Sequence, residues 1–360
     1  MLTLCEGLAS IWADPDSDGP RLAMADRLEA LDSQRAQFIR DQVLQNSSGN
    51  PTADLFEQSG PRWLQPLLAP LALDLSRLHL QHYSPSWRMC AQGHVTVRLW
   101  EEGGRQMAGL SPICWQRGFV SRLDLRPAPT MNLQQALRAE PIDQLHLAWN
   151  RHLQEGLWSR LTGPATGQIR QLSLDWKTGP APDFSSLYED PHWHSLVDLE
   201  LGCWDNGLLP EPLPTAILAR LSRSAWTAQL RLLRLYCPDC YGLDALFEQD
   251  WPQLQELEVT RIFSEGEVRG HPPALSRLPG SLRCLDFYDF EIGEEGLRQL
   301  AQATLPQLRQ LRLSGAGFSR DALEILLQAP FLQGLESLDL SRNGLQMADF
   351  PEALHSRLRL

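Results

Sequence analysis

Hydrophobic and polar positions follow a distinctive order near the end of the chain, in the stretch LESLDLSRNGL over residues 335–345. Leu335, Leu338 and Leu340 are separated by steps of three and two residues, and Asn343 follows. Successive side chains of a strand point to opposite faces, so Leu338 and Leu340 are predicted to point to one buried side. The pattern therefore predicts a short strand followed by a turn, with the asparagine amide bonded to backbone groups that water does not reach.

The same pattern recurs along the chain. Matching stretches begin at Val120, Ile142, Ile169, Leu196, Leu230, Leu254, Leu282, Leu308 and Leu335. The successive starts are separated by 22, 27, 27, 34, 24, 28, 26 and 27 residues. A period of this length is typical of leucine-rich repeats, in which each repeat adds one coil to a stack. Independent strands of an ordinary sheet would not keep this spacing.

The segments between the predicted strands indicate which kind of solenoid forms. Residues 294–307 and 319–334 carry apolar positions at helical spacing, and Ser319 stands at an expected helix start. Residues 180–195 and 261–280 are rich in Pro, Gly and Ser, so they are expected to form short turns or loops. Strands on the inside and helices on the outside predict an α/β horseshoe with a parallel concave sheet and a helical convex side.

The first part of the chain shows no repeat but carries helical spacing over residues 13–45, which predicts two helices that meet near Asp32 and Ser33. The stretch ADPDSDGPRLAMADRLEALDSQRAQFIRDQ resembles the bacterial repeat-companion domain. The matching positions are Asp14, Pro15, Arg21, Leu22, Ala25, Asp26, Leu28, Glu29, Arg35, Phe38, Ile39, Arg40 and Gln42. The segment CWQRGFVSRLDL over residues 114–125 resembles the R-G-F-V segment that commonly opens the repeats of these proteins. The resemblance implies a small helical module without established chemistry.

Four regions are therefore expected. Residues 1–45 form the helical companion module, and residues 46–61 form a linker or loop, because they are polar and contain Gly and Pro. Residues 62–118 form an N-terminal cap of one helix and a short hairpin that covers the first coil. Residues 119–360 form the leucine-rich repeats.

Composition limits the classes of partner. The chain has 32 Lys and Arg against 44 Asp and Glu, so its formal net charge is −12. This charge argues against general binding to nucleic acid or to an anionic membrane. No apolar run approaches the roughly 20 residues of a membrane span, and the start of the chain has no basic segment. We expect a cytoplasmic protein whose 7 cysteines are reduced thiols.

Candidate reactive groups are few. Cys237 and Cys240 have the spacing of a redox or metal pair, and Cys203 stands at the same place in the preceding coil as Cys237. No fourth ligand stands at zinc spacing, so buried free thiols are favoured.

Two polar segments allow a metal interpretation and a simpler one. His192 and His194 flank a tryptophan, which is typical of surface or capping residues. Asp14, Asp16 and Asp18 alternate as at the start of a calcium loop, but Pro15 and Pro20 interrupt the motif, and helix capping explains them more simply. We expect no catalytic residue, no cofactor and no metal.

Residues between the strand leucines are predicted to line the concave face. The row between the second and third apolar positions holds Asp124, His146, Ser173, Glu200, Arg234, Glu258, Asp286, Arg312 and Asp339. Three tryptophans fall at or just beyond strand ends, where they either pack as core or form an exposed aromatic ladder. The predicted partner-binding residues are Trp149, Trp176, Asp175, Asp198, Glu200, Trp204, Tyr236, Glu256, Glu258, Asp286 and Tyr288.

These features predict a non-catalytic scaffold or adaptor that binds a protein partner with a basic segment on its concave face. Two alternatives remain. The chain could be a regulatory subunit or proteolytic substrate of a larger enzyme assembly, contacted through the companion module or residues 46–61. It could also be a thiol or metal enzyme at Cys237 and Cys240.

Overall fold

The structure is a computed structural model. It describes residues 2–44, 51–71, 78–83, 95–101, 110–117, 119–125, 132–149, 162–176, 185–202, 213, 215–236, 240–260, 274–317 and 319–360. The chain forms two compact units. The first unit contains residues 1–149 and 153–172, and the second contains residues 150–152 and 173–360.

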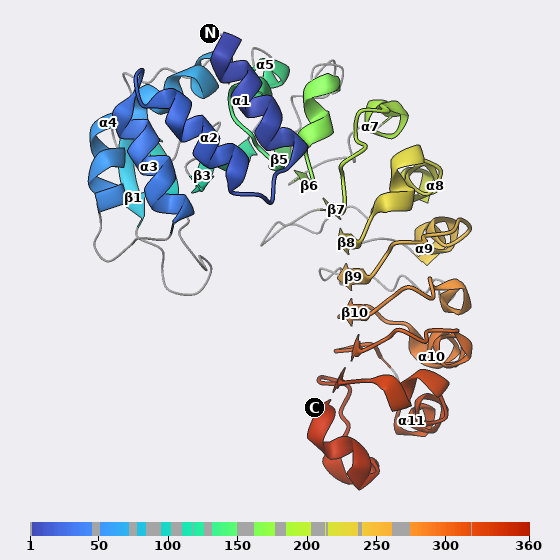
Figure 1. The fold of residues 1–360 in the computed structure, drawn as a ribbon. Coiled ribbons are helices and arrows are strands. Elements are labelled where there is room, and N and C mark those ends of the chain that lie inside the picture. Colours follow the sequence, from blue (N-terminus) through green and yellow to red (C-terminus); the bar gives the residue numbers. More distant parts are fainter. Residues whose placement is uncertain are drawn as a thin grey trace. The chain divides into compact units, whose positions relative to one another are not determined.

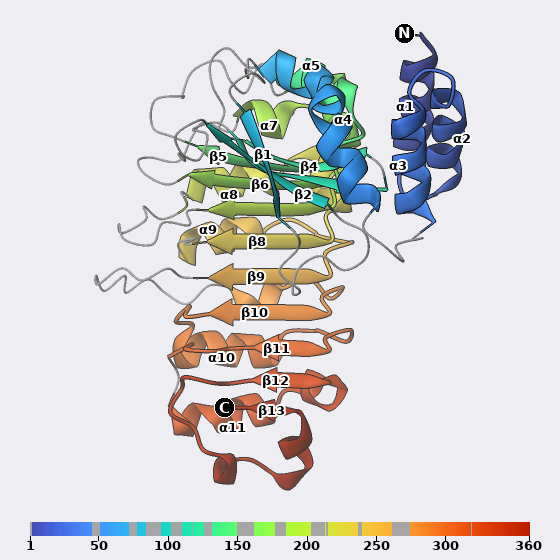
Figure 2. The same ribbon diagram turned by 90° about the vertical axis from the view of Figure 1, so that its left-hand side faces the viewer.

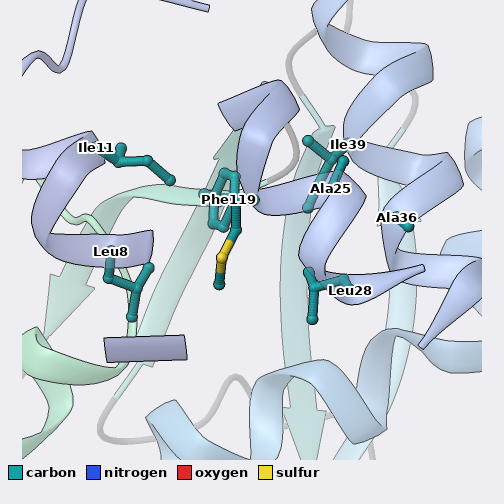
Figure 3. Packing of buried hydrophobic residues seen from close by; sticks show 8 residues of the cluster. Leu8, Ile11, Ala25, Leu28, Ala36, Ile39 and Phe119 are labelled. Atoms are coloured by element: carbon teal, nitrogen blue, oxygen red, sulfur yellow. The ribbon is translucent and has the colours of Figure 1, made fainter. Parts of the chain in front are cut away.

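The first unit begins with a module of three helices, α1 (Leu2–Ala13), α2 (Gly19–Leu28) and α3 (Ser33–Val43). The two predicted helices correspond to α2 and α3, and they meet at Asp32, whose side chain accepts a hydrogen bond from the Arg35 backbone N–H at 3.1 Å. Apolar side chains of all three helices pack into one cluster with Phe119 (Figure 3). The cluster consists of Leu8, Ile11, Met24, Ala25, Leu28, Ala36, Ile39 and Phe119.

Helix α4 (Pro51–Leu68) corrects the expected linker or loop. Residues 51–61 lie in this helix, whereas 46–50 lie outside the described residues. Pro51 is tolerated because it lies in the first turn, where the backbone N–H it lacks has no partner, whereas Pro61 and Pro66 lie further along the helix. Further along, Gly60, Leu64 and Leu68 are buried at intervals of four residues, as are Ser59, Trp63 and Leu67. This buried face explains the helix despite its polar composition.

The region before the repeats is larger than the expected single hairpin. A short 3-10 helix, η1 (Ala69–Leu71), is followed by β1 (Leu78–Tyr83), β2 (Val95–Glu101), β3 (Leu110–Gln116) and β4 (Phe119–Leu125). Each of these strands pairs with the next in antiparallel orientation. Beyond α5 (Leu133–Ala139), β5 (Gln144–Trp149) pairs with β4 in parallel. The first unit also contains η3 (Pro164–Gln168), and β6 (Gln171–Trp176) begins in it.

The second unit is a stack of parallel strands. These are β7 (Asp198–Gly202), β8 (Leu232–Tyr236), β9 (Glu256–Thr260), β10 (Cys284–Tyr288), β11 (Gln310–Arg312), β12 (Ser337–Asp339) and β13 (Leu358–Arg359). Each strand pairs with its neighbour in chain order. In Figures 1 and 2, the strands β8–β13 lie one below another and α8–α11 lie along one side of them. The second unit is therefore an α/β repeat-like fold.

The connections in the second unit are helices of different lengths. They are α7 (Ser185–Glu189), α8 (Thr215–Leu221), η4 (Ala225–Gln229), α9 (Cys240–Leu246), η5 (Leu275–Arg277), α10 (Gly293–Gln302), α11 (Arg320–Leu327), η6 (Pro330–Gly334), η7 (Met347–Asp349) and η8 (Glu352–Arg357). The two longest, α10 and α11, overlap the segments predicted to be helical. The predicted short element over residues 180–195 is α7, with 5 residues.

The apolar positions of the repeat form the core. At the second position of each strand, the structure places one leucine beside the next across β7–β12: Leu199, Leu233, Leu257, Leu285, Leu311 and Leu338. Each of these side chains is at most 1% exposed. The predicted register of the repeat is thus confirmed over these strands.

The asparagine of the opening pattern has the predicted role. Its Nδ2 donates to the backbone oxygens of Leu313 at 2.7 Å and Leu340 at 2.9 Å, and its Oδ1 accepts from the Gly317 N–H at 3.2 Å. Leu313 and Gly317 belong to the preceding repeat, so Asn343 joins two neighbouring turns.

Candidate interaction surface

A row of charged side chains crosses the sheet of the second unit. Because the strands are in register, the position between the two strand leucines holds Glu200, Arg234, Glu258, Asp286, Arg312 and Asp339 on successive strands. In the register between β12 and β13, Arg359 stands next to Asp339. The residues that sequence spacing placed in one row therefore do lie in one row from β7 to β12.

The charges in the last part of this row are balanced. Arg312 Nη1 lies 3.1 Å from Asp286 Oδ2, and Arg359 Nε lies 3.7 Å from Asp339 Oδ2. Each of these carboxylates has one guanidinium neighbour. The predicted partner-binding residue Asp286 is therefore already neutralised by the chain itself.

Excess negative charge is concentrated on β7–β9. Asp198 and Glu200 extend from β7, Glu256 and Glu258 extend from β9, and Arg234 stands on β8 between them. We call these four acidic residues the carboxylate cluster. Arg234 Nε lies 2.7 Å from Glu258 Oε2, and its Nη1 lies 3.8 Å from Asp198 Oδ1. One guanidinium among four carboxylates leaves a surplus of three negative charges.

The pairing within the carboxylate cluster is uneven. Arg234 contacts Asp198 and Glu258, whereas Glu200 and Glu256 form no ion pair within the described part of the chain. The Glu256 side chain is exposed and that of Glu200 is half-buried. These two carboxylates are therefore the ones open to an external cation.

Burial and the neighbouring charges of the carboxylate cluster raise the pKa of one of its members, Asp198. Burial raises the pKa of Asp198 to about 6; Arg234 opposes this shift, and the negative charges of Glu200, Glu256 and Glu258 add to it. The neighbouring Cys284 thiol on β10 has a pKa raised to about 11, chiefly by burial and next by the charge of Glu256. This thiol stays protonated at neutral pH, so it is a weak nucleophile.

An aromatic residue is exposed on the strand next to β9. Tyr288, on β10, is 45% exposed, and the Arg342 guanidinium lies 5.6 Å from its ring centroid. Arg342 is in turn held by Asp289 at 2.6 Å. Of the two predicted aromatic contacts whose side chains the structure describes, Tyr236 and Tyr288, the second lies at the surface.

Two predicted partner-binding residues are buried, which corrects the prediction. The Tyr236 side chain is 8% exposed, and it lies directly against Gly202, where an added Cβ would stand 2.2 Å from the Tyr236 Cβ. Because Gly202 has no side chain, it leaves room for the Tyr236 side chain on the neighbouring strand. Asp175 is 6% exposed and has a partner within the chain. The side chains of Trp149 and Trp176, and all of Trp204, lie outside the described residues.

The candidate reactive groups do not gather into a site. Cys203 and Cys237 lie outside the described residues, as does the side chain of Cys240, which begins α9. His192 Nδ1 lies 2.6 Å from Asp190 Oδ1, and His194 is exposed. Among the residues that the structure describes, no three His, Cys, Asp or Glu side chains are placed to hold a metal ion.

Two of the three alternating aspartates near the start of the chain, Asp16 and Asp18, take part in ion pairs. Asp16 Oδ2 lies 2.9 Å from Arg170 Nη1, and Asp18 Oδ1 lies 3.4 Å from Arg117 Nη1. Asp18 also precedes the first residue of α2, although its side chain makes no capping hydrogen bond. The side chains of Asp16 and Asp18 thus form ion pairs, and the expected capping hydrogen bond at Asp18 is not formed.

Sequence reasoning missed the role of the arginines. Arg234 and Arg312 stood in the same row as the acidic residues, but their pairing with particular neighbours decides where negative charge remains. The signal was present, because each arginine of that row stands between two acidic residues on the neighbouring strands.

The fold and the charged sheet face define an α/β repeat-like protein. No protein family and no curated protein matches the sequence. The solved structures that match include a crystal structure of a protein from Bacteroides fragilis. It is 12% identical, with 79% of this chain and 90% of that chain covered and a TM-score of 0.38, which supports no further argument. Within the described residues, no helix is long and apolar enough to cross a membrane.

Proposed function

We propose that this chain is a leucine-rich-repeat horseshoe with an N-terminal companion module, and that it acts without catalysis by binding a protein partner. The partner presents a basic segment, which docks on the sheet face of the second unit at the carboxylate cluster. The observation that carries this proposal is the surplus of negative charge at β7–β9, next to a sheet row that is otherwise balanced.

The arrangement suits recognition by a preformed surface. The strands are fixed in register, so the carboxylates lose little further freedom when a partner binds. Exposed charges mainly raise the rate of encounter, because complementary potentials steer the partner. Tyr288 supplies a neighbouring aromatic surface of the kind that is enriched at interfaces.

Charge reversal with a matched control tests the proposal. The variant E200K/E256K reverses the two carboxylates that form no ion pair among the described residues, and it leaves the Arg234 contacts in place. The control E324K/E352K changes the net charge equally at exposed positions of α11 and η8. Proteins retained from native cell extract by the wild type would be identified, purified and used to measure association rates.

We expect E200K/E256K to lower the association rate and to flatten its dependence on salt, while the control behaves as the wild type. Dissociation should change less than association. If the partner associates equally fast with both double variants, it does not bind at the carboxylate cluster, and the proposal is wrong.

A further inference from the structure

One arginine of the helical module reaches into the sheet region of the first unit. Arg35 Nη2 lies 2.5 Å from Oε1 of Glu140, which follows α5. The Glu140 side chain is 1% exposed and that of Arg35 is 13% exposed. The second carboxylate oxygen of Glu140 accepts a hydrogen bond from the Val120 N–H of β4 at 3.3 Å. This ion pair therefore joins α3 to the residues before β5 and to the start of β4.

Aromatic side chains surround the same arginine. Its guanidinium carbon lies 5.7 Å from the Trp115 ring centroid on β3 and 5.5 Å from the Phe119 ring centroid on β4. Phe119 also packs among the helices α1–α3, between Leu8 and Ile11 on one side and Ala25 and Ile39 on the other (Figure 3). Arg35 thus stands where helices, β3 and β4 meet.

Further contacts tie the loop between α1 and α2 to the same sheet region. Asp16 pairs with Arg170, and its backbone oxygen accepts a hydrogen bond from Arg117 Nη1 at 2.7 Å. The Asp16 side chain is 81% exposed, so this pair contributes less than a buried one. The buried Arg35–Glu140 pair is the contact whose loss would matter most, because removing one partner leaves an uncompensated charge inside the protein.

We propose that the helices α1–α3 are a locked end cap of the first unit, and that the Arg35–Glu140 pair is the lock. When the lock is broken, the cap opens as one unit and exposes Phe119 and the aromatic side chains behind it. In the closed state, Phe38 and Ile39 are buried and Gln42 is 8% exposed. The buried side chains of the segment Arg35–Gln42 consequently hold the cap in place.

Native-state hydrogen exchange of the full chain tests this inference. In E140Q, the amides of α2 and α3 should exchange at least about tenfold faster than in the wild type, because Arg35 loses its charged partner. The amides of α10 and β10 in the second unit should keep their rates. The control is R40Q, since Arg40 pairs with Asp26 and Glu29 on the exposed side of the same module. Its effect should stay within about twofold.

The double variant R35M/E140L removes both charges and leaves apolar side chains of similar size. Such replacements of buried ion pairs are often tolerated, so this variant should fold, and α2 and α3 should exchange more slowly than in E140Q. Failure of E140Q to fold, together with a folded double variant, would support the lock as well. Equal acceleration of α2 and α10 in E140Q would overturn the proposal, and so would wild-type rates for α2 and α3 in that variant. Failure of both variants to fold would also overturn it.

Discussion

A single residue, Arg234, decides how much charge the sheet face presents. It is the one basic side chain between the acidic residues of β7 and β9, and it bonds to Glu258 and approaches Asp198. The other two carboxylates of the cluster, Glu200 and Glu256, form no ion pair in the described chain. The sequence predicted an acidic surface. The structure shows that Arg234 partly neutralises Asp198 and Glu258 and leaves Glu200 and Glu256 open to a partner.

The raised pKa of Asp198 predicts how stability depends on pH. Burial raises it to about 6 in the folded chain, against roughly 3.9 for an unfolded aspartate. The folded state therefore binds the proton more tightly than the unfolded state does. The stabilisation from this group is fully present below about pH 4 and is lost as the pH rises through about 6.

We expect D198N to remove this contribution. The free energy of unfolding, measured by urea denaturation from pH 4 to pH 7.5, should fall more for the wild type than for D198N as the pH rises. D321N on α11 is the control, because Asp321 is exposed and away from the carboxylate cluster. Parallel curves for the wild type and D198N would contradict the assignment.

The sequence predicted some residues well and others not at all. Asn343 was placed correctly, because its role follows from its position after a strand. Tyr236 was not, because the glycine that makes room for it stands 34 residues earlier, on β7, and only the register of the stack brings the two together. Spacing along one strand predicts which face a side chain takes, but it does not predict how large its neighbours are.

At the scale of elements, strands were predicted best. Each strand of the second unit from β7 to β12 begins within two residues of the apolar position expected from the repeat, because every strand buries leucines at a fixed spacing. The first part of α4, residues 51–61, was missed, since Gly and Pro content outweighed the four-residue interval of its buried positions, whereas its last part falls in the region where one helix was expected. The strands β1–β3 carry no repeat pattern, so the sequence predicted a short hairpin but not the number or length of these strands.

Helix α11 offers a test of local structure. The Ser319 hydroxyl precedes the helix and accepts a hydrogen bond from the Ala322 N–H at 3.4 Å, in the position of an N-cap. S319A should lower the free energy of unfolding by about 1 kcal/mol, because one N–H of the first turn loses its partner.

The matched control for this change is S337A, at an exposed position of β12. Urea denaturation of both variants would compare the losses. If S337A destabilises the chain as much as S319A, the cap is not the cause.

At the scale of the whole molecule, each strand from β8 to β12 pairs with its two neighbours in the sheet, and β13 pairs with β12. Stability in such a stack is a sum of the stability of each repeat and of the contacts between adjacent repeats. A defect in a central repeat weakens contacts on both sides. A defect in the last repeats allows fraying that stops at the first intact one.

Two leucines in equivalent positions separate these effects. Leu257 lies on β9 between β8 and β10, and Leu338 lies on β12 between β11 and the two-residue strand β13. Both are buried, so each change to alanine removes contacts and leaves a cavity. Each should lower the free energy of unfolding by about 2–5 kcal/mol. L257A should accelerate amide exchange in β8, β9 and β10, whereas L338A should accelerate it in β12 and β13 and leave β8 unchanged. If L338A accelerates exchange in β8 as much as L257A does, the second unit opens as one block. If L257A is as stable as the wild type, Leu257 does not contribute to the stability of the core.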